Sequence, residues 1–195
     1  MSRIGIFSGS FNPIHSGHIA FALQALESAN LDKVYFLPER RPALKQVEHF
    51  GHRVAMIKQA IMPHPKFNVL ELTDISFSVE RTLPKLQTLF AGEQLVFLTG
   101  SDVAEKLIGW PKVDRLLKSA ELVIGVRVGQ DKYKLAETIS QWQPTPLQVI
   151  ILDAWAPKVS SSKVRAALRN NKRESGILAS VERYSNKNWL YVSIA

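Results

Sequence analysis

The stretch that decides the fold reads Ile4-Gly5-Ile6-Phe7-Ser8-Gly9-Ser10-Phe11-Asn12-Pro13-Ile14-His15-Ser16-Gly17-His18. Its first residues form a short apolar run, which predicts a buried strand, and Gly9 predicts a turn directly after that strand. A helix is expected to begin near Gly17, with the imidazoles of His15 and His18 on one face of its first turn. The unpaired N–H groups and the dipole at such a helix start favour an anion, so this segment predicts a phosphate-binding site.

Apolar runs of strand length recur along the chain and alternate with segments of helical periodicity, which is typical of a parallel sheet. The expected strands cover residues 4–8, 33–37, 67–72, 94–99, 121–126 and 147–152. The expected helices cover residues 17–28, 51–61, 79–90, 103–108, 113–118, 133–142 and 161–170. This order predicts an α/β fold, a doubly wound Rossmann-like parallel sheet with helices on both faces. Ligands of such a sheet bind at the carboxyl ends of its strands.

The composition is that of an ordinary globular protein with one core. Of the 195 residues, 46% are hydrophobic and 22% are charged, so residues 1–195 are expected to form a single domain, with residues 175–195 as an atypical C-terminal element. The sequence shows neither a membrane-spanning run nor a secretory signal, and a cytoplasmic location is expected. The absence of cysteine excludes disulfides and thiolate chemistry, and leaves His, Lys, Arg, Ser and carboxylates for catalysis.

The net charge of +8 and the pI near 9.8 favour anionic partners, either nucleic acid or small phosphorylated molecules. The basic residues are scattered from Arg3 to Lys187 and form no recognised nucleic-acid module. The sequence therefore predicts small-molecule substrates, with neither nucleic acid nor a membrane as partner. Assembly into a homo-oligomer is left open.

Two distant motifs resemble those of one enzyme family. The segment from Gly9 to His18 resembles the Gly-x-Phe-x-Pro-x-His-x-Gly-His signature of the HxGH nucleotidyltransferase superfamily. Near the other end, Val159-Ser160-Ser161-Ser162-Lys163-Val164-Arg165 resembles the family's Ile-Ser-x-Thr-x-x-Arg element. Within the superfamily the likeness is to the bacterial nicotinate mononucleotide adenylyltransferases. That resemblance implies that ATP and nicotinate mononucleotide are joined into deamido-NAD with release of pyrophosphate.

Two other functions remain open beside this one. The same transfer could use another phosphorylated acceptor, such as nicotinamide mononucleotide or phosphopantetheine. A different class of protein, a non-catalytic nucleotide-binding module, would keep the motifs without the reaction. The intact histidines and Arg165 argue against the binding module, because its motifs would not need a complete set of groups for phosphate transfer.

The resemblance implies roles for the first motif. His15 and His18 would be catalytic and contact the phosphates of ATP, with His18 stabilising the transition state, while Gly9, Ser10 and Phe11 would approach ATP through their backbone. A His-x-x-His spacing can also chelate a metal, but the sequence offers no acidic or cysteine ligand nearby, so no metal site is expected. Mg²⁺ is expected to accompany ATP, held by phosphate oxygens and water.

The second motif has two interpretations that can hold together. Ser160, Ser161 and Ser162 precede a helical pattern, and one serine is well suited to cap that helix. Three serines exceed what a cap needs, and a cation such as Arg165 in a first helical turn favours a compensating anion. The resemblance supplies that anion, because the serines and Arg165 would bind the β- and γ-phosphates of ATP.

The remaining candidates follow other strands. Gly100 and Asp102 resemble the family's Gly-x-Asp, whose carboxylate accepts from a ribose hydroxyl of ATP, although Asp102 is also placed to cap a helix. For the acceptor, the resemblance implies Lys45 in a proline-rich loop, Trp110 against the pyridine ring and Arg127 in an Arg-x-Gly element. Lys45 could instead be solvated, and Trp110 could belong to the core.

The match to the family fails in two segments. The family's Ser-Tyr-Thr-x-x-Thr-Leu is replaced by Ser76-Phe77-Ser78-Val79-Glu80-Arg81-Thr82-Leu83, which shifts the aromatic residue by one place. After Arg165 the closing pattern Pro-x-x-Val-x-x-Tyr-Ile is not found, and the segment 189–192 is expected to replace it in packing. Arg53 lies in a predicted helix that also resembles the family. Its side chain could be either a phosphate contact or a solvent-facing charge.

Overall fold

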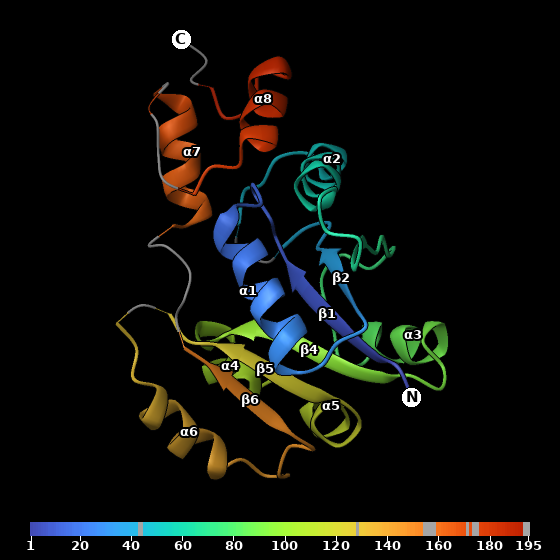
Figure 1. The fold of residues 1–195 in the computed structure, drawn as a ribbon. Coiled ribbons are helices and arrows are strands. Elements are labelled where there is room, and N and C mark those ends of the chain that lie inside the picture. The colour runs from blue at the N-terminus through green and yellow to red at the C-terminus, as the bar shows by residue number, and fades with distance from the viewer. Residues whose placement is uncertain (43–44, 128, 154–158, 171, 173–175, 193–195) are drawn as a thin grey trace. The chain divides into compact units, whose positions relative to one another are not determined.

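The computed structural model describes residues 1–42, 45–127, 129–153, 159–170, 172 and 176–192, which form a six-stranded sheet and its helices (Figure 1). The strands are β1 (Arg3–Gly9), β2 (Lys33–Pro38), β3 (Phe67–Val69), β4 (Gln94–Gly100), β5 (Glu121–Gly125) and β6 (Val149–Leu152). The helices are α1 (Ser16–Ser28), α2 (Phe50–Ile61), α3 (Thr82–Leu89), α4 (Ser101–Leu107), α5 (Val113–Ser119), α6 (Lys132–Ser140), α7 (Ser161–Arg169) and α8 (Ala179–Lys187). Among the described residues, no helix has the length and apolar character needed to cross a membrane.

The strands stand in the order β3-β2-β1-β4-β5-β6. The neighbours β1 and β4, β4 and β5, and β5 and β6 pair in parallel, for example with Ile4 opposite Leu95 and Val96 opposite Glu121. The chain moves outward from β1 to β3, returns to β4 beside β1, and moves outward again to β6. This is the order of a doubly wound sheet, and the predicted Rossmann-like α/β fold is confirmed.

The central strands are buried along most of their length, which explains why the sequence revealed them. Four consecutive residues are buried in each of β1 and β4, and four of the five residues of β5 are buried. A parallel sheet is covered on both faces, so its strands appear in the sequence as continuous apolar runs instead of alternating patterns.

Three elements differ from the expectation by more than two residues. β3 ends at Val69 instead of 72, and α3 begins at Thr82 instead of 79. The start of α3 is delayed by a turn in which the Ser78 N–H donates to Thr82 Oγ1 over 3.0 Å, and the Thr82 N–H donates to the Ser78 carbonyl over 2.8 Å. The third difference is α8, which the sequence left unassigned because it buries only Val181 and Ser185 and is otherwise largely polar.

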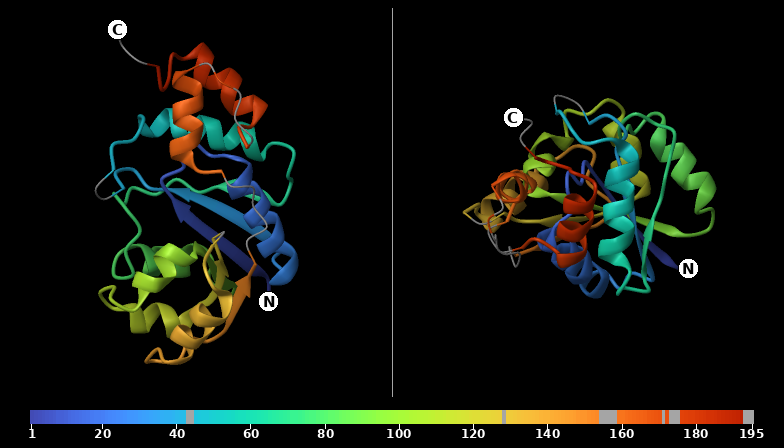
Figure 2. Two further views of the ribbon diagram at one scale, coloured as in Figure 1. Left: turned by 90° about the vertical axis from the view of Figure 1, so that its left-hand side faces the viewer. Right: turned by 90° about the horizontal axis from the view of Figure 1, so that it is seen from above.

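The chain divides into two compact units, each built from separate stretches. Unit 1 comprises Met1–Ser8, Ala22–Tyr35 and Phe77–Ala154, and unit 2 comprises Gly9–Phe21, Phe36–Ser76 and Trp155–Ala195. In unit 1, α4 packs on β4 and β5 and against α6 (Figure 1). In unit 2, α8 lies between α2 and α7 (Figure 2). That the whole chain acts as a single domain stays a prediction.

Candidate active site

The loop after β1 brings two imidazole rings together. The His15 backbone N–H donates to Nδ1 of His18 over 3.2 Å, and the two rings stack with their centroids 3.7 Å apart. Because Nδ1 of His18 accepts a hydrogen bond, the proton of the neutral ring lies on Nε2, which is a donor. The expected pairing of the rings is confirmed, but α1 begins at Ser16, so His15 precedes the helix instead of lying in its first turn.

The residues before the histidines turn sharply and are held from within the protein. Phe11 is 1% exposed and has a φ of +43°, in the left-handed region. A Cβ placed on Gly9 would lie 3.2 Å from the Phe11 ring, so glycine suits this close approach. The Gly9 carbonyl accepts from the Glu39 N–H over 3.0 Å, and the Ser10 carbonyl accepts from Arg53 over 2.7 Å. These contacts support the backbone of the loop from the segments that follow β2.

The second motif lies directly against the first within unit 2. Ser161 Oγ donates to the Pro13 carbonyl over 2.9 Å, and a terminal nitrogen of Arg165 donates to the Asn12 carbonyl over 2.8 Å. These partners are 148 and 153 residues apart in the chain. The expected approach of the serine–arginine element (residues 159–165) to the histidine loop (residues 10–15, between β1 and α1) is therefore confirmed.

The first turn of α7 shows that one serine does cap the helix. Ser160 is the N-cap residue, and its Oγ accepts from the Lys163 N–H over 3.3 Å. Ser162 is exposed, and its Oγ accepts from a terminal nitrogen of Arg165 over 3.1 Å. The guanidinium of Arg165 is thus oriented on both sides, by Asn12 and by Ser162.

Arg53, whose exposure the sequence left open, is fully buried. Its guanidinium donates to three backbone carbonyls: to Glu48 over 2.9 Å, to Ser10 over 2.7 Å and to Arg40 over 3.0 Å. Burial lowers the pKa of this guanidinium from its ordinary value. Arg53 therefore ties the loop after β1 to the segment between β2 and α2, and it is not a solvent-facing charge. Lys45, by contrast, is exposed.

In unit 1, two predicted site residues form an ion pair. A terminal nitrogen of Arg127, in the loop after β5, lies 3.0 Å from Oδ2 of Asp102 in the first turn of α4. Gly100 is the N-cap residue of α4, and the helix has no side-chain cap, so Asp102 does not play the capping role that its position suggested. Both side chains of the pair are partly exposed, which leaves them accessible to a ligand.

Trp110 lies in a loop after α4 and is half-buried. Its ring is tilted against that of Phe77, with the centroids 6.0 Å apart, and Phe77 also makes an edge contact with Phe97 at 5.1 Å. Phe77 is the aromatic residue that stands one place away from the family's pattern. Within unit 1 it nevertheless lies beside the tryptophan that is expected to stack on the pyridine ring.

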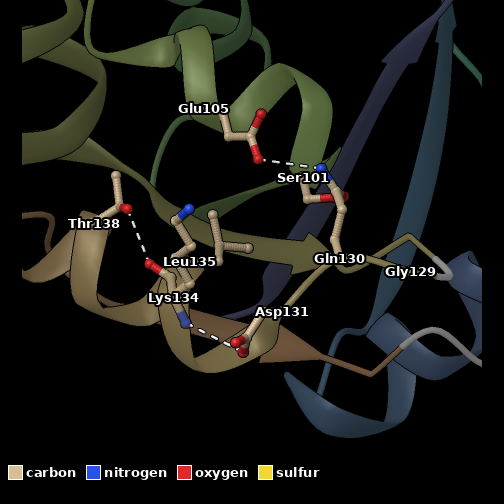
Figure 3. Close-up of a pocket in the computed structure, with 8 residues that line it drawn as sticks. All are labelled: Ser101, Glu105, Gly129, Gln130, Asp131, Lys134, Leu135 and Thr138. Carbon is tan, nitrogen blue, oxygen red and sulfur yellow. Dashed lines mark hydrogen bonds between the residues drawn. The ribbon is translucent and has the colours of Figure 1, made fainter.

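A cavity of about 540 Å³ lies between α4 and α6 in unit 1 (Figure 3). It is lined by Ser101, Glu105, Gly129, Gln130, Asp131, Lys134, Leu135 and Thr138. Gln130 lies in the loop before α6 and is hydrogen-bonded to α4 on the other side of the cavity. It accepts from Ser101 Oγ and donates to Glu105 over 3.1 Å. The Ser101 hydroxyl also accepts from the Arg127 N–H over 3.2 Å. None of the predicted site residues lines the cavity, although Gly100 and Asp102 adjoin Ser101 in sequence.

Asn12 and the C-terminal segment were not predicted to belong to the site. Asn12 is 4% exposed and accepts from Arg165, yet only its neighbours in the motif had been selected. The closing pattern is partly present after all, because Val181 and Tyr184 have its Val-x-x-Tyr spacing. Val181 is buried, and the Tyr184 hydroxyl is hydrogen-bonded to His52 Nδ1 over 3.0 Å. This Val-x-x-Tyr spacing was the feature of the sequence from which α8 could have been predicted.

The predicted site residues divide between the two units. Unit 2 contains Gly9, Ser10, Phe11, His15, His18, Lys45, Ser160, Ser161, Ser162 and Arg165, and unit 1 contains Gly100, Asp102, Trp110 and Arg127. Over the part of the chain that the structure describes, no three His, Cys, Asp or Glu side chains are grouped so that they could hold a metal ion.

The chain is similar to known proteins in sequence and in fold. Residues 6–167 match the model of the Cytidylyltransferase-like family. The chain is 32% identical over 202 residues to the nicotinate-nucleotide adenylyltransferase of Bacillus subtilis (strain 168), an alignment that covers 99% of this chain and 100% of that protein. Its fold is similar to that of Plasmodium falciparum nicotinic acid mononucleotide adenylyltransferase complexed with NaAD, with a TM-score of 0.80, 18% identity and 98% coverage of both chains.

Proposed function

Since the chain belongs to the Cytidylyltransferase-like family and, within it, to the nicotinate-nucleotide adenylyltransferases, we propose that it transfers the adenylyl group of ATP to nicotinate mononucleotide. In this reaction a phosphate oxygen of the mononucleotide forms a bond to the α-phosphorus of ATP. The bond from that phosphorus to the bridging oxygen breaks, and its electron pair leaves with pyrophosphate. The other product is deamido-NAD, a precursor in NAD biosynthesis.

The observation that best supports this proposal is the contact between the two motifs in unit 2. Ser161 and Arg165 reach the carbonyls of Pro13 and Asn12, two and three residues before His15. Helix starts, imidazoles and a guanidinium are therefore gathered at one place, where each favours negative charge. A triphosphate is the substrate group that such a collection of donors fits.

The reaction needs little proton transfer, because the second ionisation of a phosphate monoester occurs near pH 6 and the attacking oxygen is already charged at neutral pH. The tasks left to the protein are to align the two phosphates and to stabilise charge that develops at the α-phosphorus. His18 is suited to the second task, because the His15 N–H fixes its Nδ1 as acceptor and so makes Nε2 the donor. His15 is proposed to bind the phosphates beside it.

The other site residues are proposed to bind the two substrates. Gly9, Ser10 and Phe11 would approach the nucleotide with their backbone, and the serines 160–162 with Arg165 would bind the β- and γ-phosphates. Gly100 and Asp102 would bind the ribose of ATP, with Asp102 oriented by its ion pair to Arg127. Trp110, Lys45 and Arg127 are assigned to the acceptor, with Trp110 stacking on its pyridine ring.

Mg²⁺ is proposed to enter as part of the substrate, bound to ATP. Among the described residues no side-chain cluster fits a resident metal, so phosphate oxygens and water would supply most of its ligands. The metal would neutralise part of the triphosphate charge. A cytoplasmic location and assembly into a homo-oligomer stay predictions.

The proposed function is tested with the purified protein, ATP and Mg²⁺. Pyrophosphate release is measured with nicotinate mononucleotide, nicotinamide mononucleotide or 4′-phosphopantetheine as acceptor, and the nucleotide product is identified by its mass. Release is expected to be fastest with nicotinate mononucleotide. A preference for another acceptor would contradict the proposed substrate but not the proposed reaction. If no pyrophosphate were released with any of the three acceptors, the protein would be a nucleotide-binding module instead of an enzyme of this reaction.

Replacing Arg165 with alanine is expected to raise the KM for ATP about ten-fold or more, because a charge-assisted contact to phosphate is lost. The KM for the acceptor should change far less. Arg169→Ala is the matched control, since it removes the same charge from the exposed last turn of the same helix. Initial-rate kinetics with each substrate varied in turn measure both effects. Equal increases in the two KM values would contradict the assignment of Arg165 to ATP.

A further inference from the structure

The segment after α8 returns into the interior of unit 2. Leu190 and Tyr191 are each 7% exposed, and the Leu190 N–H donates to the Ser185 carbonyl over 2.9 Å. Tyr191 has a φ of +63°, in the left-handed region that a non-glycine residue rarely adopts. A tyrosine is held in this conformation only when its surroundings stabilise it, so the contacts of its side chain are informative.

The hydroxyl of Tyr191 contacts the histidine loop directly. It donates to Oδ1 of Asn12 over 2.9 Å, in a buried hydrogen bond between residues 179 positions apart. Burial raises the pKa of the Tyr191 phenol, so the phenol stays neutral and keeps its proton near neutral pH. The C-terminal segment therefore supplies a permanent donor to the loop.

Asn12 is the residue at which several supports of the loop meet. Its Oδ1 also accepts from the Glu48 N–H over 3.1 Å, and its amide nitrogen lies 3.5 Å from the Gln46 carbonyl as a donor. Its own backbone carbonyl accepts from Arg165 over 2.8 Å. A rotation of the Asn12 side chain would break its hydrogen bonds to Tyr191 and to the segment before α2, while its backbone carbonyl is held by Arg165.

We propose that Tyr191 is a positioning residue for the histidine loop. It acts through Asn12 on the backbone between Ser10 and His15, where ATP is proposed to bind. This inference rests on the proposed function, because it assigns the loop to ATP. Tyr191 does not touch the substrate; it fixes the side chain that links the loop to its neighbours. A loop held in its binding geometry before ATP arrives binds more tightly and aligns the α-phosphate better.

The test compares two variants that each lose one hydroxyl from the C-terminal region. Tyr191→Phe removes the donor to Asn12 and keeps the ring that fills the interior. Tyr184→Phe is the matched control, because its hydroxyl is hydrogen-bonded to His52 in the same unit instead of to the histidine loop. Thermal unfolding of both variants establishes that they are folded and shows how far each loses stability.

Tyr191→Phe is expected to lower kcat/KM for ATP about three- to ten-fold, the effect of one well-placed hydrogen bond, whereas Tyr184→Phe stays near the wild-type value. The affinity for ATP alone, measured by titration calorimetry, should fall in the same variant only. Hydrogen exchange in residues 10–15 should become faster there as well.

Wild-type ATP affinity and kcat/KM in Tyr191→Phe would overturn the inference, and so would equal losses in both variants. The calorimetric arm separates this result from a failure of the proposed function. If the wild-type protein binds ATP but releases no pyrophosphate with any acceptor, the proposed reaction fails while a selective loss of affinity in Tyr191→Phe still supports the positioning role.

Discussion

His18→Ala is expected to lower the turnover of pyrophosphate release by about a hundred-fold or more, the usual effect of removing one donor to a transition state. The His15 N–H holds Nδ1 of this ring as an acceptor, so the donor at Nε2 is already directed before the substrate binds. Alanine removes that donor and the ring that stacks on His15 at 3.7 Å. Single-turnover kinetics at saturating ATP and nicotinate mononucleotide measure the chemical step directly.

The control for this variant is His64→Ala. His64 lies in the turn after α2, where its ring packs near Phe67, so this change removes an imidazole from the same unit but outside the loop. Its turnover should equal that of the wild-type protein. Circular dichroism of both variants checks that they are folded. A His18→Ala enzyme with wild-type turnover would exclude the proposed transition-state role.

Arg53→Met is expected to lower the free energy of unfolding by about 3–5 kcal/mol, because a buried side chain is exchanged and three partly buried carbonyls lose their donor at once. Methionine fills part of the space but offers no N–H groups to Glu48, Ser10 and Arg40. The Ser10 carbonyl belongs to the histidine loop, so the variant should also lose affinity for ATP. Urea denaturation followed by circular dichroism measures the loss of stability.

Lys58→Met provides the comparison on the same helix. Lys58 is paired with Glu71 at 2.9 Å, but its side chain is 59% exposed, and exposed ion pairs contribute at most about 1 kcal/mol. Arg53→Lys should fall between the two, since one ammonium cannot reach three carbonyls that a planar guanidinium serves together. A loss below about 1 kcal/mol in Arg53→Met would mean that the buried hydrogen bonds contribute little.

Most of the fold could be predicted because the sheet depends on a local signal. Strands buried on both faces require continuous apolar runs, and such runs located all six strands, with the last residues of β3 as the main error. α3 began later than periodicity suggested, because the Thr82 side chain closes a turn that no periodic pattern records. α8 was not predicted, because a helix that buries few residues shows only a weak hydrophobic periodicity.

The site was predictable where chemistry requires specific residue types at fixed spacing. The histidine motif and the serine–arginine motif were recognised separately, and the family resemblance implied that both bind ATP. Their direct contact through Ser161 and Arg165 is visible only in the structure. The supports of the loop were not predictable in this way. Arg53 and Tyr191 act through hydrogen bonds to partners far away in the sequence, and only the folded chain shows that their polar groups point inward.

The hydrogen bond between Tyr191 and Asn12 also has a consequence for how the protein is made. The two residues are 179 positions apart, which corresponds to about 10–35 seconds of translation at about 5–20 residues per second. The segment with the histidines thus leaves the ribosome early but waits for its last support until position 191 has been synthesised. A nascent chain that has not reached that point carries the two imidazoles proposed to be catalytic but lacks the Tyr191 hydroxyl that contacts Asn12.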